Sequence, residues 1–486
     1  MTEEIQSTAD AHPEWETLQT FAARRAPVAE HLAAGKSVRA KHPRSGFGEY
    51  VQRRRGDAAL EIIQAQNATR VASLVPVRMA RMLASPFAYL RGSAAVMAAD
   101  LARTPSSGLN VYACGDMHLL NFGLFASAER NLVFAINDFD EVHPGPWEWD
   151  LKRLAASAAV AAIFLGGDRD HARAAAFACG EAYVRRIRRY AQMGYLETWY
   201  DLIDEETILA LASPQQRRYA RSIIDKARAR GPVRALERLT EEVDGRPRII
   251  EDVPLIVRET RLPNGLPIGE ALDIMLRSYL ASLPLDRQHL LSRYRIVDVA
   301  RKVVGVGSVG TSCWLALFEG LDSSDPLLLQ VKEAQPSILA AHVDHKLEIS
   351  NQGRRVIVGQ RMIQGSPDIF LGWGPNAGDT GLRDFYVRQL ADMKGGIRLL
   401  EGDVAALGSI DAYCRLCGWA LALAHAKSGD PAMISGYCGR SHAIPDALVS
   451  FAMAYLEQTL RDHDRLAVAV RAGRVAVANA KEAGIG

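Results

Sequence analysis

The chain has 486 residues, more than one ordinary hydrophobic core organises, so we expect two or three domains. Its 48% hydrophobic and 23% charged residues are the composition of a globular protein. The net charge of +2 argues against a surface dedicated to nucleic acid, and the basic runs at 53–55 and 185–189 are more typical of solvated helix faces.

The N-terminal stretch and the cysteines bear on the cellular compartment. Residues 1–10 are polar and acidic and contain no signal-peptide core. The Ala-rich run at 155–165 is too short to span a bilayer and predicts a buried helix. Cys414 and Cys417 share one face of a predicted helix, which favours packing over metal or redox chemistry. We expect a cytoplasmic protein with reduced cysteines and no membrane partner.

The first 90 residues are predicted to be helical, with apolar helical spacing at 57–70 and 77–83. Another helix is predicted at 94–102. Arg91 lies between them, just before a polar segment, where it is either a surface or capping residue or a contact for a ligand of that segment.

That polar segment follows a predicted strand at 111–114. It places Asp116, His118 and Asn121 within six residues and has glycines on either side. Asp, His and Asn are also ordinary turn formers and helix caps, so a purely structural role is the first alternative.

A second strand is predicted at 132–136, and Asp138 and Asp140 follow at its end. An Asp at 116, an Asn five positions later and then a hydrophobic strand ending in Asp-Phe is the order that a kinase-type phosphotransferase needs. In such enzymes one acid orients and deprotonates the acceptor hydroxyl, and the Asn and the second Asp hold Mg²⁺. A zinc site is a further alternative; its possible ligands are Asp116, His118, Asp138 and His143, which lack the regular spacing of a structural site.

Asp150 opens the Ala-rich helix and is placed to cap its first turn. Residues 165–290 are predicted to be mostly helical, and no motif in them points to chemistry. This region is long enough to form an insertion or a cap that faces the substrate.

Strands are predicted at 296–304 and 311–319, on both sides of a glycine-rich loop. A dinucleotide-binding turn would lead into a helix, whereas this loop leads into an apolar strand, which favours a hairpin whose backbone closes over phosphates. Glycines that serve only the turn are the alternative. The loop residues of interest are Gly305, Gly307, Ser308 and Gly310.

Lys332 lies on a third apolar strand at 327–334. A buried ammonium needs an anion, so an inward Lys332 predicts a phosphate or a carboxylate beside it. A helix predicted at 336–349 carries Glu348 near its end, the one candidate on that helix for the carboxylate.

The remaining chain is expected to complete a small sheet and then return to helices. Strands are predicted at 354–358 and 360–363, and 391–396 is expected to link the sheet to the following helices. These helices are predicted at 409–428 and 447–472.

Two resemblances follow from these residues. The segment around Asp116 and Asn121 and the strand end at Asp138 resemble the catalytic and metal-binding segments of the aminoglycoside and choline kinase-like group. Asp150 is similar to an Asp that braces the catalytic loop of that group through backbone hydrogen bonds. More closely, most of the chain from about residue 50 resembles an uncharacterised bacterial family known as a domain of unknown function, DUF2252, which implies a fold kinship and supplies no substrate.

The kinase-like resemblance implies an α+β, two-lobed fold with a small antiparallel N-lobe sheet and a large helical C-lobe. In kinases the glycine loop and the lysine precede the catalytic loop; here they follow it, which implies a circular permutation. The expected parts are a helical extension (1–90), a C-lobe part with the catalytic loop and a helical insertion (91–290), the sheet (291–395) and the completing helices (396–486).

The roles implied for single residues follow from the same resemblance. Asp116 would be the catalytic base, Asn121 and Asp138 the Mg²⁺ ligands, and Lys332 with the glycine loop the ATP phosphate site. The supporting residues are His118, Asp140, Asp150, Arg91 and Glu348.

We therefore expect an ATP- and Mg²⁺-dependent phosphotransferase that acts on a small-molecule or protein hydroxyl. The alternatives are a nucleotide-binding module without transfer activity, a nucleotidyl transferase on the same fold, and a hydrolase with a metal at Asp116, His118 and Asp138.

Overall fold

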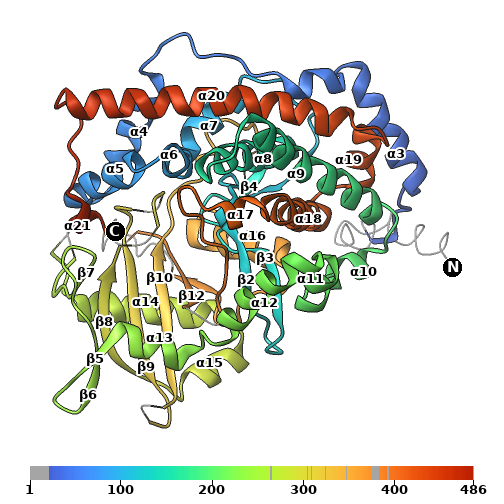
Figure 1. Cartoon of the computed structure of the whole chain (residues 1–486). Helices are drawn as coiled ribbons and strands as arrows, with labels where there is room; N and C mark the ends of the chain where they lie inside the picture. Colours follow the sequence, from blue (N-terminus) through green and yellow to red (C-terminus); the bar gives the residue numbers. More distant parts are fainter. Residues whose placement is uncertain are drawn as a thin grey trace.

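The structure is a computed structural model. It describes residues 21–262, 265–303, 305–307, 309–322, 324–345, 347–374, 383–390 and 393–484. Within them the chain is an α+β protein, with helices packed on helices in one part and an antiparallel sheet in the other (Figure 1). No helix in the described ranges has the length and hydrophobicity needed to cross a membrane.

The centre of the helical part is built from three helices, α8 (Trp147–Phe164), α9 (Arg169–Tyr190) and α18 (Ile410–Ser428). Most of α8 is buried, as predicted from its alanines, because small side chains let neighbouring helices approach on every side. Cys414 and Cys417 lie buried on α18 as free thiols, as expected.

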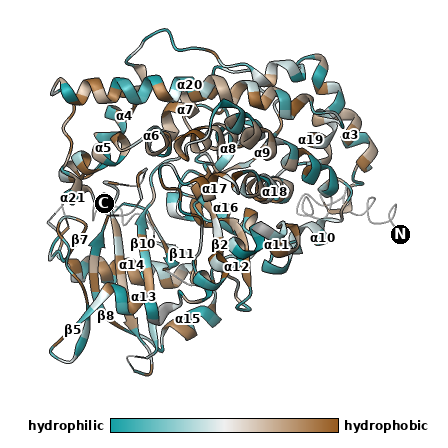
Figure 2. Ribbon diagram, in the orientation of Figure 1, coloured by the Kyte–Doolittle hydropathy of each residue, from teal (hydrophilic) through white to brown (hydrophobic). Residues whose placement is uncertain are grey.

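The two ends of the described chain meet over these central helices. The long helix α20 (Ala443–Arg471) runs across α8 and α9, and the N-terminal helices lie beneath and beside it (Figure 1). In Figure 2 α20 alternates between hydrophilic and hydrophobic colours along its length, as an outer helix with one buried face does. The neighbouring elements are α3 (Val28–Ser37), α4 (Ala58–Asn67), α5 (Val75–Leu83), α6 (Pro86–Gly92), α7 (Ala94–Leu101), α19 (Pro431–Cys438) and α21 (Ala480–Ala483).

Two small antiparallel pairs position the polar segments. β1 (Asn110–Ala113) pairs with β4 (His143–Pro146), and β2 (Phe122–Ala126) pairs with β3 (Leu132–Ile136). The strand predicted at 132–136 is therefore confirmed with its bounds.

The main sheet has six antiparallel strands in the order β11-β12-β10-β9-β8-β7. The strands predicted around the glycine loop are confirmed as the β8–β9 hairpin, and β10 carries Lys332. The strand bounds are β7 (Ile256–Val257), β8 (Arg295–Lys302), β9 (Cys313–Glu319), β10 (Pro326–Glu333), β11 (Gly372–Gly374) and β12 (Phe385–Gln389).

Both faces of this sheet are covered, which explains why β9 and β10 read as unbroken apolar runs. Trp314 and Leu329 belong to a cluster with α14 (Ile268–Ser282), and Leu315 and Leu328 belong to another with α13 (Pro232–Leu239). The intervening residues 165–290 are mostly helical, as predicted, but they also supply edge strand β7. Their other elements are α10 (Tyr195–Tyr200), α11 (Glu205–Leu211), α12 (Pro214–Arg228), β5 (Thr240–Val243), β6 (Arg246–Ile249) and α15 (Leu285–Leu291).

Two expectations after β10 were wrong. The described residues of 336–345 and 347–349 form turns, bends and irregular structure instead of a helix. Glu141 accepts from the Ser337 hydroxyl through its backbone carbonyl and from Ile338 N through its carboxylate. The segment expected to hold two strands is helix α16 (Gln352–Ile363), which Asn351 caps by accepting from Arg354 N. The segment forms a helix and not two strands because helical spacing places its apolar residues on one face, which packs against the helical part.

Candidate functional site

The loop after β1 presents Asp116 in a fixed backbone. Gly115 has φ +75°, and a Cβ there would lie 3.0 Å from the Glu141 side chain, so a glycine is required on both counts. His118 N donates to Asp116 O at 2.9 Å, and the Asn121 side-chain amide donates to the same carbonyl at 2.6 Å. The polar segment is thus a loop whose backbone is fixed by internal hydrogen bonds.

Asp150 braces this loop from behind. Its carboxylate accepts from Cys114 N at 2.6 Å and from Gly115 N at 2.9 Å. The expectation that Asp150 caps its own helix was wrong: α8 begins at Trp147, and the carboxylate is used by the loop.

Behind Asp150, two buried residues extend the brace into the helical core. His425 on α18 lies 3.4 Å from the Asp150 carboxylate, and the Tyr183 hydroxyl on α9 lies 2.8 Å from the other ring nitrogen. His425 is fully buried although it lies in the last turn of α18. Its complete burial on a polar neighbour could not be read from the spacing of α18.

Asp116 faces the cavity with one oxygen held and one open. Arg153 on α8, which is 1% exposed, donates to Oδ1. Burial raises the pKa of Asp116 to about 6, although Arg153 acts in the opposite direction. His118 lies 4.0 Å from Oδ2, and burial holds the pKa of this imidazole well below its ordinary range, so it is neutral.

Asn121 and Asp138 are brought side by side by the β2–β3 hairpin, because Asn137 N donates to Asn121 O at 3.0 Å. The amide nitrogen of Asn121 is used in its bond to Asp116, and its oxygen remains for a ligand. Asp138 Oδ1 is buried without a hydrogen-bond partner, and its nearest described cation is the Lys332 ammonium at 3.9 Å, beyond hydrogen-bond distance.

This donor pair fits a magnesium ion. Mg²⁺ prefers oxygen ligands and is commonly held by one or two protein groups together with substrate phosphates. An orphaned carboxylate oxygen is costly unless a cation or a donor reaches it. The described residues contain no group of three or more His, Cys, Asp or Glu suited to a metal, so neither the zinc site nor the metal-hydrolase alternative gains support. His143 instead bonds to Pro144 O.

Lys332 crosses from the sheet to the segment after β3. Its ammonium lies 2.5 Å from Asp140 and 3.9 Å from Asp138, although 192 positions separate Lys332 from Asp140. Burial lowers the pKa of Lys332, but these two carboxylates raise it well above its ordinary value. Burial raises the pKa of Asp140, and Lys332 with the Tyr386 hydroxyl brings it down to about 2.

Glu348 does not pair with Lys332, contrary to the role considered for it. It is exposed and lies in a bend, since the helix that was to present it does not form. The lysine finds its carboxylates on the segment after β3 instead.

The glycine loop lies against the N-terminal helices and over Asp116. Arg81 donates to Gly305 O at 2.6 Å, and Val71 N donates to Gly310 O at 2.8 Å. A Cβ at Gly307 would lie 3.8 Å from Asp116 Oδ2. The loop therefore approaches the predicted catalytic acid, and Ser308 lies outside the described residues.

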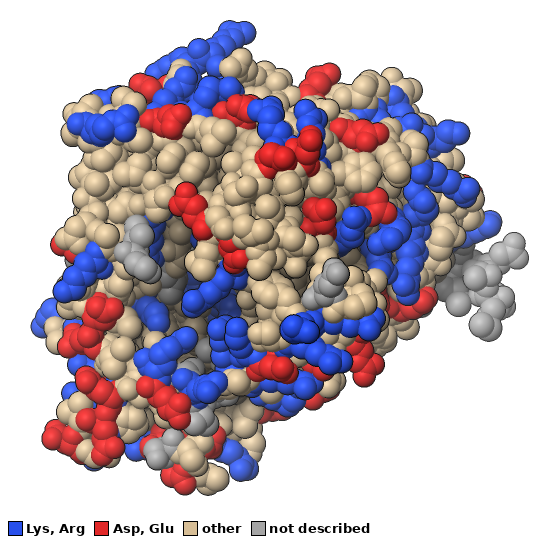
Figure 3. Space-filling view, viewed as in Figure 1, with Lys and Arg blue, Asp and Glu red and all other residues tan. Residues whose placement is uncertain are grey.

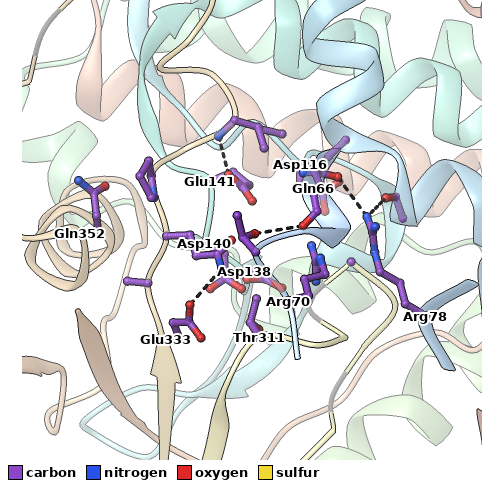
Figure 4. A pocket seen from close by; sticks show the side chains of 18 of the residues that line it. Gln66, Arg70, Arg78, Asp116, Asp138, Asp140, Glu141, Thr311, Glu333 and Gln352 are labelled. Carbon is purple, nitrogen blue, oxygen red and sulfur yellow. Dashed lines mark hydrogen bonds between the residues drawn. The ribbon is translucent and has the colours of Figure 1, made fainter. Parts of the chain in front are cut away.

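Asp116, Asn121, Asp138, Asp140 and Gly307 line one cavity of about 990 Å³. Lys332 does not line it but lies buried behind Asp140, to which it is paired. Figure 4 shows Asp116, Gln66, Arg70 and Arg78 toward one side of it and Asp140, Glu333 and Gln352 toward the other. Figure 3 shows a hollow between the helices and the sheet, with Lys and Arg in and around it. A cavity of this size accommodates a nucleotide together with part of a second substrate.

Several lining or supporting residues were missed in the sequence. Arg91 was noted there and lines the cavity, and its Nε is buried without a partner. Arg153 stands three positions after Asp150 on an otherwise Ala-rich helix, a signal that could have been used. Arg70, Arg78 and Tyr386 carry no local pattern that separates them from structural residues.

Comparison with known proteins gives one match. No curated protein and no solved structure matches the chain at a significant level. A family model described as "Uncharacterized protein conserved in bacteria (DUF2252)" matches residues 70–469, which include Asp116, Asn121, Asp138 and Lys332. The chain therefore belongs to the DUF2252 family of uncharacterised bacterial proteins.

Proposed function

We propose that the chain is an ATP- and Mg²⁺-dependent phosphotransferase with a circularly permuted, kinase-like arrangement of its parts. The observation that carries the proposal is the convergence at one cavity of two distant sets of residues. Asp116, Asn121 and Asp138 come from the first half of the chain, and Gly307 of the glycine loop comes from the second. Lys332, also from the second half, reaches the cavity wall through its ion pair with Asp140.

The order of the parts within the sheet supports this proposal. The glycine loop joins β8 to β9, Lys332 lies on the next strand, and helix α16 follows it. Protein kinases have the same succession of glycine-rich loop, lysine strand and helix. The permuted order costs little, because each part keeps its neighbours in space.

The residues present assign a role to each part of the reaction. The acceptor hydroxyl oxygen forms a bond to the γ-phosphorus of ATP, the bond from that phosphorus to the bridging oxygen breaks, and ADP leaves with the electron pair. Asp116 takes the hydroxyl proton on Oδ2, the oxygen that Arg153 leaves open. Asn121 and Asp138 would hold Mg²⁺, which neutralises phosphate charge when it is bound.

The other residues work by positioning and by charge. Lys332 offers its ammonium to the nucleotide phosphates, and the glycine loop supplies backbone N–H groups. Asp150 keeps the loop around Asp116 in place through two hydrogen bonds. Catalysis of this type depends on preorganised charge more than on covalent steps.

One departure favours a second candidate function. Helix α16 contains no acidic residue, so the lysine–glutamate pair that active protein kinases require is absent among the described residues. This favours a nucleotide-binding module without transfer activity, and a nucleotidyl transferase that moves AMP is the other alternative.

The first experiment measures nucleotide binding through the melting temperature of the full chain with and without Mg-ATP. A ligand at a hundred times its Kd stabilises the fold by about 2.7 kcal/mol, which is a shift of about 3 °C for a chain of this length that melts in one step. We expect this shift in the wild type and in Asp116→Asn, and a smaller one in Lys332→Ala. Glu348→Gln, an exposed carboxylate away from Lys332, is the matched control and should behave as the wild type.

The second experiment follows the label of ATP into products formed with a small-molecule extract. Transfer of a γ-label that Asp116→Asn abolishes supports the phosphotransferase. Transfer of an α-label would support the nucleotidyl transferase in place of the phosphotransferase. Binding without either transfer would support the nucleotide-binding module. No shift with millimolar Mg-ATP in the wild type would sink all three.

A further inference from the structure

The described residues contain eight buried side-chain nitrogen or oxygen atoms without a hydrogen-bond partner, and four of them belong to residues that line the candidate cavity. One is Asp138 Oδ1, which suits a cation. The other three are the Nε atoms of Arg70, Arg78 and Arg91. Unsatisfied buried donors are rare in folded proteins, and three in one cavity indicate a missing acceptor.

The three arginines form no close ion pair, although Asp116 and Asp138 act on Arg91 through space, and Glu141 and Glu333 act on Arg70. None of them forms an ion pair with a carboxylate of the residues that the structure describes. Arg78 is 1% exposed, and its recorded bonds go to neutral oxygens of Gln66, Asn67 and Gly92. Arg91 donates no hydrogen bond to a described residue. A buried guanidinium without an anion is unfavourable, so an anion bound here would stabilise the site.

The acids of the same cavity do not pair directly with these arginines, and apart from Asp138 Oδ1 they are held by other groups. Their recorded contacts are Asp116 with Arg153, Asp140 with Lys332, Glu141 with the Ile338 N–H, and Glu333 with Arg383. The cavity thus has an acidic part that is mostly held by its own partners and a basic part in which three buried guanidinium nitrogens have no hydrogen-bond acceptor.

The basic part lies on the helical wall beside Asp116. Arg70 follows α4, Arg78 is on α5, and Arg91 is in the last turn of α6. Figure 4 shows Arg70 and Arg78 on the side of Asp116, opposite Glu333 and Gln352. The backbone carbonyl of Arg91 and Asp116 Oδ2 would both lie within 4 Å of a Cβ at Gly307, so Arg91 and Asp116 meet at the same point of the glycine loop.

The beginning of α7 adds to this anion-binding character. Ala94, its first residue, lines the cavity, and Ser93 before it makes no side-chain capping bond. Free N–H groups of a helix start attract anions. Burial and the neighbouring Arg70 lower the pKa of Arg78 to about 9, which leaves it charged at neutral pH.

We propose that the acceptor substrate carries an anionic group, a phosphate or a carboxylate, in addition to the hydroxyl that is phosphorylated, and that Arg70, Arg78 and Arg91 bind this group beside Asp116. The inference rests on the proposed phosphotransferase function and names its substrate class. It sets this chain apart from the resemblance noted above, because an aminoglycoside or a choline is a cation that this wall repels.

The test titrates inorganic phosphate into the full chain by calorimetry at constant ionic strength, first alone and then with Mg²⁺ and a non-hydrolysable ATP analogue at saturation. We expect phosphate to bind in both cases. Arg91→Leu should weaken it about tenfold or more, since it removes a charged donor. Arg383→Gln is the matched control, because Arg383 lines the same cavity but is already paired with Glu333.

A parallel titration with malonate distinguishes the two sources of negative charge: tighter phosphate binding assigns a phosphorylated acceptor, and tighter malonate binding assigns a carboxylic acid. The Arg91 side chain makes no hydrogen bond within the described residues, so Arg91→Leu should leave the fold intact. Arg78→Met would remove a buried hydrogen bond to Gly92 O and is the poorer test. Failure of phosphate to bind the wild type, or equal binding by Arg91→Leu, overturns the inference.

Displacement of phosphate by the ATP analogue would also overturn it, because the arginines would then serve the nucleotide, and the proposed function would stand. Failure of the analogue itself to bind would sink the phosphotransferase and the acceptor role together, while the titration without nucleotide still reports on the arginine wall.

Discussion

Removal of the ion pair between Lys332 and Asp140 should weaken the whole fold, because it joins the sheet to the segment after β3. The two side chains are 3% and 26% exposed, and their charged atoms lie 2.5 Å apart. At an effective dielectric constant of about 20 the attraction is about 7 kcal/mol, most of which is offset by desolvation. Asp138 at 3.9 Å contributes a further attraction of about 4 kcal/mol on the same scale.

These magnitudes set the loss of unfolding free energy expected for Asp140→Asn, Lys332→Met and the double variant. Breaking a buried pair from one side costs about 3–5 kcal/mol. We expect Asp140→Asn to fall at the lower end, since Asp138 still faces the lysine. Lys332→Met leaves two carboxylates that are partly exposed and can be hydrated. The double variant should cost less than the sum of the single variants by about 2 kcal/mol or more, as for residues in direct contact.

The assay is guanidinium chloride unfolding of the full chain, followed by tryptophan fluorescence. It reports on both parts of the fold, because Trp314 lies in the sheet and Trp147 in the helical part. Glu348→Gln is the control and should change stability by no more than about 0.5 kcal/mol. Additivity of Lys332→Met and Asp140→Asn within about 0.5 kcal/mol would refute the pairing on which this reasoning rests.

Three further predictions address the loop, the core and the packing of the helices. Asp150→Asn should retain Mg-ATP binding but slow transfer about 10–100-fold, because one of two charge-assisted bonds to the loop is lost, and equal kcat values would contradict the brace. Burial lowers the pKa of Lys152 to about 8, so the unfolded chain holds this proton more tightly and wild-type stability should gain about 3 kcal/mol from this group between pH 8 and 10.5. Lys152→Met should lack that gain in urea titrations at the two pH values, and identical pH slopes would exclude it. Gly418→Ala should destabilise the fold by about 1–3 kcal/mol, because its Cβ would lie 2.3 Å from Cys179 O, whereas Gly194→Ala, with open space around it, should not.

Elements with a strong local pattern could be predicted from the sequence. The strand at 132–136 and the helices at 409–428 and 447–472 appear in the structure within a few residues of their expected bounds. Each combines a clear apolar period with a Gly, Pro or polar boundary, so local preference and tertiary packing agree.

Local pattern failed where tertiary contacts decide. Val356, Ile357 and Val358 are β-branched and predict a strand, yet they lie in α16, where Gly353, Val356 and Ile357 are buried. The prediction of a carboxylate partner for Lys332 failed for the same reason. A lysine strand followed by a helix suggests a glutamate on that helix, whereas the actual carboxylate stands 192 positions earlier. No spacing rule reaches across that distance.

The segment from Asp138 to Glu141 supplies the carboxylate that pairs with Lys332, so no glutamate on α16 is needed for this ion pair. It supplies the orphaned oxygen that fits a metal and, two positions later, the carboxylate of Lys332. Arg355 on α16 donates to the backbone carbonyls of Asp140, at 2.9 Å, and of Val142, at 2.6 Å. The helix is therefore fixed to this segment through main-chain bonds.

The position of the Lys332 partner on the loop after β3 bears on how the proposed reaction would be regulated. In a kinase whose lysine partner lies on the helix, a movement of the helix breaks the pair and turns the site off. Here the carboxylate belongs to the loop after β3, and α16 is fixed to that loop through Arg355, so the pair needs no acid on the helix. If a metal takes Asp138, Lys332 still keeps Asp140 at 2.5 Å, and its charge remains in place for a phosphate. Under the proposed function, control would then depend on the occupancy of the cavity by the two substrates, and the arginine wall beside Asp116 would bind the second of them.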